Sequence, residues 1–95
     1  TGGGLTENIP RILPNGLGAR LEQSAWPSLP VFDWLSKSGV AMREMLRTFN
    51  CGIGMVVIVE PSATKTTLAT LESCGEKAWE IGKIIEDEKQ QIHIR

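Results

Sequence analysis

A run of five apolar residues, Met55–Val59, constrains the fold of this chain more than any other stretch. Four of the five are β-branched, and no polar residue alternates with them. Such a short run is typical of a strand buried between two layers. Just before it, Asn50, Gly52 and Gly54 form a loop that tolerates unusual backbone angles and close approach of another group. The pattern predicts a loop entering a central strand, where open α/β sheets bind ligands; an ordinary turn before a core strand fits the same residues.

Length and composition limit the classes of protein that this chain can belong to. Its 95 residues suffice for one small domain, and 41% hydrophobic with 22% charged residues is an ordinary globular composition. A net charge of −1 and a pI of about 5.8 give no basic footprint, which argues against nonspecific nucleic-acid binding. No apolar run approaches the roughly 20 residues of a membrane span, and no signal peptide is recognised.

The two cysteines and the N-terminal residues give two further expectations. Cys51 and Cys74 are too few and too far apart for a disulfide framework, so we expect free thiols in a cytoplasmic protein. The sequence opens on Thr1 and three glycines without an initiator Met, which indicates part of a longer chain.

A second glycine-rich stretch, Gly2–Gly4, precedes a short helical turn predicted at Leu5–Ile9. Thr6 is a possible N-cap of that turn, and Pro10 limits its extension. Glycines that run into a helix can turn successive N–H groups toward one anion. A tight connecting turn is the alternative, and the Gly-Lys-Ser/Thr ending of a Walker A loop is absent.

Hydrophobic spacing predicts three longer helices, at Val31–Ser38, Val40–Phe49 and from Pro61 to about Cys74. In the second helix, a buried stripe is expected at Met42, Met45, Leu46 and Phe49. In the third, Leu68 and Leu71 are expected to face inward, and Gly75 to cap the end.

Alternation and turn residues predict the strands. Leu17–Leu21 follows the turn Pro14-Asn15-Gly16, Lys77–Ile85 follows the third helix, and Gln91–Arg95 is a possible edge strand. Gln23–Pro30 is predicted to be a loop anchored by Trp26. Strand, helix and strand from Met55 to Ile85 predict a βαβ or split-βαβ unit.

No residue cluster in the sequence has complete catalytic chemistry. Cys51 is a candidate nucleophile without a base nearby in sequence, because the one histidine, His93, lies in the tail. No metal-ligand spacing is present. Arg47 lies beside the Asn50 loop and can reach an anion there, although a solvated arginine at a helix end is the simpler interpretation.

Two longer segments, Thr1–Arg11 and Arg47–Met55, resemble signatures of the aminoimidazole ribonucleotide synthetase family, also called phosphoribosylformylglycinamidine cyclo-ligases. Their order and spacing agree along nearly the whole chain. Further matches are Leu13-Pro14 before Gly16–Ala19, Val31–Leu35 and Gly75–Gly82. The resemblance covers part of the family's C-terminal domain, so residues 1–95 are expected to be a portion of that domain without the N-terminal ATP-binding domain.

This resemblance implies an α+β fold of α/β/α layers, with a mixed sheet of partial ferredoxin-like topology. It implies an ATP- and Mg-dependent ligase of purine biosynthesis that closes formylglycinamidine ribonucleotide to aminoimidazole ribonucleotide, releasing ADP and phosphate. It further implies a cytosolic homodimer, in which most ATP and metal contacts lie outside this chain.

The two loops are the expected binding site for a small-molecule nucleotide. The glycines of the first loop, with the N–H groups entering Leu5 and Thr6, are expected to hold a phosphate, and the asparagines to orient the substrate. The candidate residues are Gly2, Gly3, Gly4, Asn8, Asn50, Gly52 and Gly54. No catalytic residue and no metal ligand is identified. The alternatives are another ATP-using superfamily member, such as formylglycinamidine ribonucleotide synthetase, and a non-catalytic fragment or dimerisation module.

Overall fold

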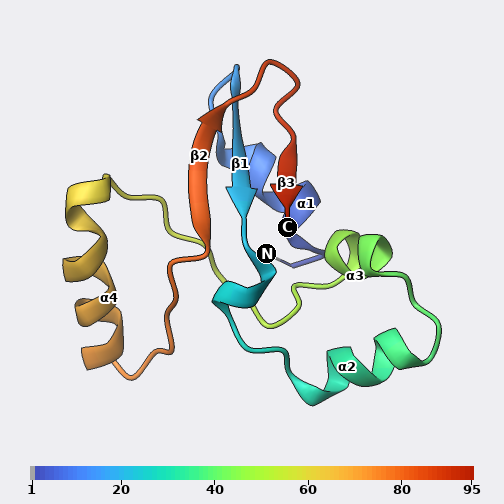
Figure 1. The fold of residues 1–95 in the computed structure, drawn as a ribbon. Coiled ribbons are helices and arrows are strands. Elements are labelled where there is room, and N and C mark those ends of the chain that lie inside the picture. Colours follow the sequence, from blue (N-terminus) through green and yellow to red (C-terminus); the bar gives the residue numbers. More distant parts are fainter. Residues whose placement is uncertain (1) are drawn as a thin grey trace.

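A computed structural model describes residues 2–95 of the chain, so Thr1 lies outside the described residues. Short helices and strands follow one another along the chain (Figure 1). The α-helices are α1 (Leu5–Asn8), α2 (Pro30–Lys37), α3 (Met42–Thr48) and α4 (Thr64–Ser73). The 3-10 helices are η1 (Ile9–Ile12), η2 (Gln23–Ala25) and η3 (Pro61–Ala63), and the strands are β1 (Leu17–Leu21), β2 (Gly82–Glu86) and β3 (Ile92–Ile94).

The three strands form one mixed sheet in the order β2-β1-β3. β1 pairs antiparallel with β2 and parallel with β3, so Ala19 lies opposite both Ile84 and Ile92. β1 has the predicted bounds, and β3 is an edge strand as predicted. Helices with a mixed sheet confirm the α+β class.

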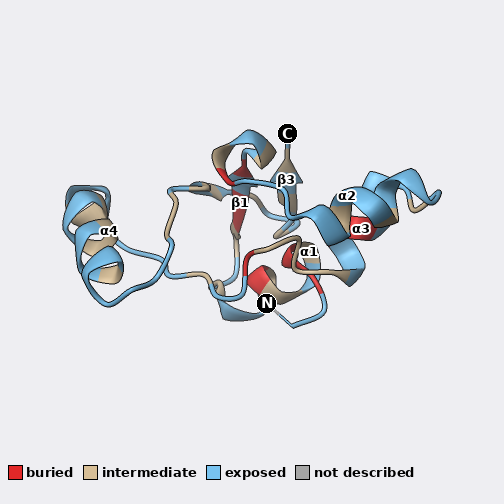
Figure 2. Ribbon diagram, turned by 90° about the horizontal axis from the view of Figure 1, so that it is seen from below, coloured by how far each residue is buried: buried red, intermediate tan, exposed pale blue. Residues whose placement is uncertain are grey.

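The core lies where β1 meets α1 and α3. Leu5 is completely buried, Ala19 and Met45 are 2% exposed, and Trp26 anchors the loop after β1 as predicted. In Figure 2 the buried segments gather around β1, α1 and α3, while α2 and α4 are largely exposed. The remaining buried side chains are those of Ile9, Leu21, Leu46 and Ile53.

The three longer predicted helices are confirmed, with small shifts at their ends. α2 begins one residue earlier than predicted, and α4 ends before Gly75, which has a φ of 85°. Two burial predictions are wrong. Met42 is 47% exposed because it opens α3, and Leu68 and Leu71 are only half-buried because no layer covers α4. No helix within residues 2–95 is both long and apolar enough to span a membrane.

The molecule is flattened and looser than a compact domain of this length. Its principal extents are 41 × 36 × 20 Å. Its radius of gyration is 13.8 Å, where a compact domain of this size has about 12 Å. Figures 1 and 2 both show α4 standing apart from the sheet, at the end of two long connecting segments.

The predicted central strand is the main correction. Met55–Val59, hereafter the apolar segment, belongs to no helix or strand. Its exposed fractions are 81% for Met55, 55% for Val57, 44% for Ile58 and 39% for Val59. No other segment of residues 2–95 lies alongside as a strand partner, and β structure requires one. For the same reason the predicted βαβ unit does not form here, and Lys77–Ile81 is not strand because β1 ends at Leu21, opposite Gly82.

Candidate substrate- and phosphate-binding loops

The first candidate loop, Gly2–Asn8, lies against the end of α3. Gly4 has a φ of 109°, and a Cβ there would collide with the carbonyl oxygen of Arg47. Only glycine fits this position, because both the backbone angle and the contact exclude a side chain. Gly3 has a φ of 96°, but a Cβ there would lie at an ordinary contact distance of 3.7 Å from Asn8 Nδ2. Close packing against α3 therefore explains why residue 4 is glycine. At Gly3 there is room for a side chain, and only the positive φ favours glycine.

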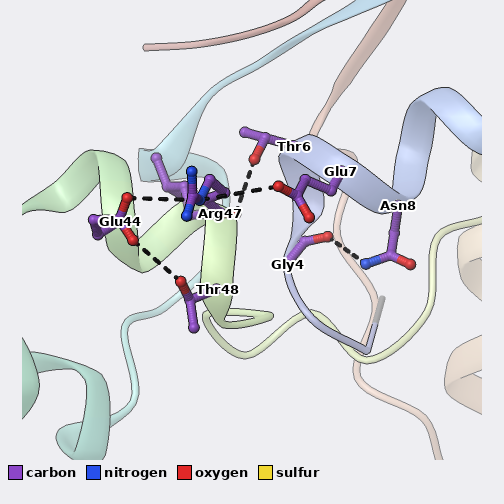
Figure 3. Close-up of polar contacts among 8 residues, drawn as sticks. Gly4, Thr6, Glu7, Asn8, Glu44, Arg47 and Thr48 are labelled. Atoms are coloured by element: carbon purple, nitrogen blue, oxygen red, sulfur yellow. Dashed lines mark hydrogen bonds and ion pairs between the residues drawn. The ribbon is translucent and has the colours of Figure 1, made fainter.

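Asn8 closes the first loop with its side-chain amide. Its Nδ2 donates to the carbonyl oxygens of Gly2 at 2.9 Å and Gly4 at 2.8 Å. An amide nitrogen has two N–H groups, so both donors are engaged. Figure 3 shows the side-chain oxygen of Asn8 pointing away from Gly4. Asn8 thus holds the loop with its donors and retains an acceptor on the outside.

Thr6 does not cap α1, in contrast to the prediction. The N-cap position is Gly4, which makes no side-chain capping bond, and Thr6 lies within the helix. The Thr6 hydroxyl instead donates to the carbonyl oxygen of Leu46 at 3.4 Å (Figure 3). Thr6 therefore ties α1 to α3.

The second candidate loop, Asn50–Gly54, has the unusual backbone predicted for it. Cys51 and Gly52 have φ of 53° and 97°. The Gly52 N–H donates to Asn50 Oδ1 at 2.9 Å, which is an Asx turn. A Cβ at Gly52 would lie 3.6 Å from Leu29, and one at Gly54 would meet nothing within 4 Å. Asn50 uses its acceptor within the loop, the converse of Asn8.

Trp26 and the Cys51 thiol hold the second loop in place. The indole Nε1 of Trp26 donates to the carbonyl oxygen of Cys51 at 3.0 Å, and the Cys51 thiol points to the carbonyl oxygen of Met45 at 3.5 Å. Burial raises the pKa of this thiol above its ordinary value. A protonated, hydrogen-bonded thiol is a poor nucleophile. The contacts of Cys51 therefore fit a role in holding the second loop against α3 better than a role as a nucleophile.

The C-terminal turn of α3 joins the two loops. Its carbonyl groups contact Thr6 and Gly4 from the first loop and Cys51 from the second. Asn50 follows two residues after the helix ends at Thr48. The sequence separates the loops by more than 40 positions, and the structure brings both to one helix end.

The charges around this helix end are mixed. Arg47 Nε lies 3.5 Å from Glu44 and 3.9 Å from Glu7, and its side chain is 59% exposed (Figure 3). Exposed pairs of this kind contribute only about 0–1 kcal/mol each. Arg47 lies beside the Asn50 loop as predicted, and the structure also brings it to Glu7 of the first loop; two carboxylates already accompany it.

His93, the other candidate for chemistry, lies on β3 and pairs elsewhere. Its Nε2 is 2.7 Å from Asp87 Oδ2. The hydrogen bond from His93 and one from the Lys89 N–H lower the pKa of Asp87. Within residues 2–95, no group of three or more His, Cys, Asp or Glu side chains is arranged to hold a metal ion.

The described surface hollows lie away from both loops. One is lined by residues between Glu72 and Trp79, and the other by residues at the end of the sheet, including Arg20 and Arg95. Neither contains a residue of the candidate loops. In the loops themselves, Gly2, Gly3 and Gly54 are exposed, whereas Gly4 and Ile53 are buried.

Comparison with known proteins shows the family. The profile described as "AIR synthase related protein, C-terminal domain" matches residues 1–95. The chain belongs to this family. It is 54% identical over 86 residues to the phosphoribosylformylglycinamidine cyclo-ligase of Nitrosococcus oceani, and 53% identical over 85 residues to that of Methylobacillus flagellatus. These matches cover 90% and 88% of this chain but 24% and 25% of the relatives, so the chain spans about a quarter of their length.

The sequence indicated both loops, but it did not indicate that Thr6 and Trp26 hold them in place. Thr6 and Trp26 hold the loops through hydrogen bonds to backbone carbonyls far away in sequence. Local patterns carried a signal for the other two contacts. Asn50 two residues before a glycine indicates an Asx turn, and Asn8 is four residues after Gly4, one helical turn away.

Proposed function

We propose that the full-length protein is an ATP-dependent cyclo-ligase of purine biosynthesis. It closes formylglycinamidine ribonucleotide to aminoimidazole ribonucleotide and releases ADP and phosphate. The observation that carries this proposal is the identity of about 54% to relatives named phosphoribosylformylglycinamidine cyclo-ligase. Two glycine-asparagine loops gathered at one helix end give such an enzyme a place to hold a polar, phosphorylated substrate.

In this proposal the first loop holds a phosphate through its backbone. Gly2 and Gly3, with the N–H groups entering Leu5 and Thr6, supply the donors. Because α1 is only four residues long, individual N–H groups contribute more than a helix dipole does. Gly4 supports the loop by its packing on Arg47.

The two asparagines then have complementary roles in orienting the substrate. Asn8 has engaged its donors within the loop and offers its side-chain oxygen as an acceptor. Asn50 accepts the Gly52 N–H with its oxygen and offers its amide N–H groups as donors. Because Gly52 and Gly54 have no side chain, the substrate can approach the backbone closely at these positions.

The chemistry that these residues serve is positioning and charge stabilisation. ATP activates the formyl oxygen by phosphorylation, and the amidine nitrogen then closes the ring. Fixed donors around a phosphate and an oriented polar substrate lower the barrier of such a step without a protein nucleophile. That requirement agrees with the half-buried thiol of Cys51, whose pKa is raised by burial.

The remainder of the full-length protein supplies the rest of the site in this proposal. Residues 1–95 are a portion of a C-terminal domain with α/β/α layers and a partial ferredoxin-like sheet, and an N-terminal domain carries most contacts to ATP and Mg²⁺. The assembled enzyme is a cytoplasmic homodimer without nucleic-acid or membrane partners. The 95-residue chain alone is expected to be inactive.

A matched pair of glycine substitutions tests the role of the first loop in the full-length enzyme. Gly3→Ala and Gly16→Ala both place a side chain at a positive φ, 96° and 85°, and neither Cβ has a contact closer than 3.7 Å. Each costs about 1 kcal/mol of backbone strain. Gly16 lies in the remote turn before β1. We expect Gly3→Ala to raise KM for substrate or ATP about tenfold, and Gly16→Ala to leave KM unchanged.

The assay is ATP-dependent formation of aminoimidazole ribonucleotide under steady-state conditions. Equal KM values for the two variants would remove the phosphate-binding role of this loop. If the unmodified full-length enzyme forms no aminoimidazole ribonucleotide from ATP and formylglycinamidine ribonucleotide, the proposed function itself fails.

A further inference from the structure

The apolar segment Met55–Val59 is an exposed apolar surface that neither the fold of residues 2–95 nor the candidate loops explain. Four of its five side chains are between 39% and 81% exposed, and only Val56 packs partly against the core. A contiguous exposed apolar run is uncommon on soluble proteins and marks a contact surface. β-Branched residues in such a run favour a strand as its paired state.

The backbone of the apolar segment is unpaired as well. Within residues 2–95, no hydrogen bond joins the main chain of Met55–Val59 to another segment. Both ends are nevertheless fixed, because Ile53 donates to Asn50 and Ala63 donates to Glu60. The segment is therefore held between two turns with a row of open N–H and C=O groups.

The helix that follows, α4, also lacks a packing partner within residues 2–95. α4 contains no buried residue, and within residues 2–95 no layer faces its half-buried Leu68 and Leu71 (Figure 2). A helix with an apolar side ordinarily covers a sheet or another helix. One added sheet layer beside the apolar segment would supply a partner for both elements.

We propose that the apolar segment is a docking edge for a β-strand from the part of the full-length polypeptide that this chain does not span. Backbone pairing satisfies the open N–H and C=O groups, and the new strand with α4 covers the apolar side chains. The occupant is a strand of the same polypeptide for two reasons. About three-quarters of the relatives' length lies outside the matched region. A tethered strand also binds at a high effective concentration.

The sequence of the segment also favours a permanent partner of this kind. Its side chains are apolar on both faces, as in strands buried between layers. An edge reserved for transient partners is protected by charges or proline, and Met55–Val59 contains neither. The pairing is independent of cyclo-ligase activity, since it concerns folding and not turnover.

Amide hydrogen exchange of the full-length protein, compared with the 95-residue chain, tests the pairing. We expect the amides of residues 55–59 to exchange at least about 100-fold more slowly in the full-length protein, at any protein concentration. Equal exchange in the two samples overturns the proposal. Protection that is lost on dilution of the full-length protein also overturns it, because the occupant is then a second copy.

A matched pair of lysine substitutions tests the surface by a second route. Val57 is 55% exposed and Val31, on α2, is 54% exposed, so the two side chains are equally solvated in residues 2–95. In the full-length protein we expect Val57→Lys to raise the unfolding equilibrium constant about tenfold or more above Val31→Lys, because a charge at a paired strand becomes buried. Equal stability of the two variants in chemical denaturation contradicts the docking edge. Hydrogen exchange of the unmodified protein decides if Val57→Lys does not fold.

Discussion

β1 has a weak strand-forming sequence, Leu-Gly-Ala-Arg-Leu, and the apolar segment has a strong one, yet only β1 is a strand. β1 has a neighbour on each side, and Ala19 and Leu21 are at most 4% exposed. The apolar segment is richer in β-branched residues, yet Val57 is 55% exposed and its backbone has no partner within residues 2–95. The contrast shows that β propensity describes a fit to neighbouring strands, and that it determines nothing where those neighbours are absent.

The largest expected effect comes from truncating one side chain in each region of the 95-residue chain. Leu21→Ala in β1 should destabilise it by about 3 kcal/mol, because it leaves a cavity in the core. Val57→Ala should change the free energy of unfolding by less than about 0.5 kcal/mol, because the side chain is solvated. Urea denaturation measures both. A similar loss for the two variants would mean that the apolar segment is paired in the isolated chain.

A smaller effect is expected at the anchor that precedes the apolar segment. Trp26→Phe keeps most of the buried ring but removes the N–H that donates to the Cys51 carbonyl oxygen. The loss should be about 1 kcal/mol, as for one neutral hydrogen bond. Hydrogen exchange should quicken in residues 50–54, while β1 keeps its protection. Faster exchange throughout β1 would show instead that the whole core has loosened.

The smallest effect concerns the turn that carries β2 into β3 beside β1. Asp87 accepts from His93 and from the Lys89 N–H, and its own N–H donates to Gly16. The hydrogen bonds from His93 and the Lys89 N–H lower the pKa of Asp87, so their stabilisation is complete above the ordinary carboxyl pKa. It is lost as the pH falls through the lowered pKa of the folded state.

Thermal unfolding of the unmodified chain and of Asp87→Asn between neutral pH and strong acid measures this contribution. The unmodified chain should lose slightly more stability on acidification, because the variant has no carboxylate at this position to protonate. Identical pH profiles would mean that the Asp87–His93 pair does not persist in solution.

Local patterns sufficed where the deciding interactions are local. The bounds of β1, the end of α4 before Gly75 and the turn at Asn50 all follow from neighbouring residues. Sequence patterns gave wrong predictions where the structure of a segment depends on contacts with residues far away in the sequence. Among residues 2–95 no strand lies beside Met55–Val59, and Thr6 donates to a carbonyl of α3 that no local rule connects to it.

For the candidate loops, the sequence pattern indicated the glycines and asparagines but not which contact each of them makes. Gly4 is required by its contact with Arg47, which arises only when α1 packs on α3. Which half of each asparagine remains outward likewise depends on backbone geometry that composition does not reveal.

The packing of Gly4 on the carbonyl oxygen of Arg47 has a consequence for motion. Because Gly4 packs directly on that carbonyl, motion of the first loop is coupled to the last turn of α3, and the second loop continues from that same turn. A ligand that immobilises one loop would therefore reduce the conformational entropy that remains to be lost at the other. If both loops bind ligands as proposed, each ligand would raise the affinity for the other without any contact between them.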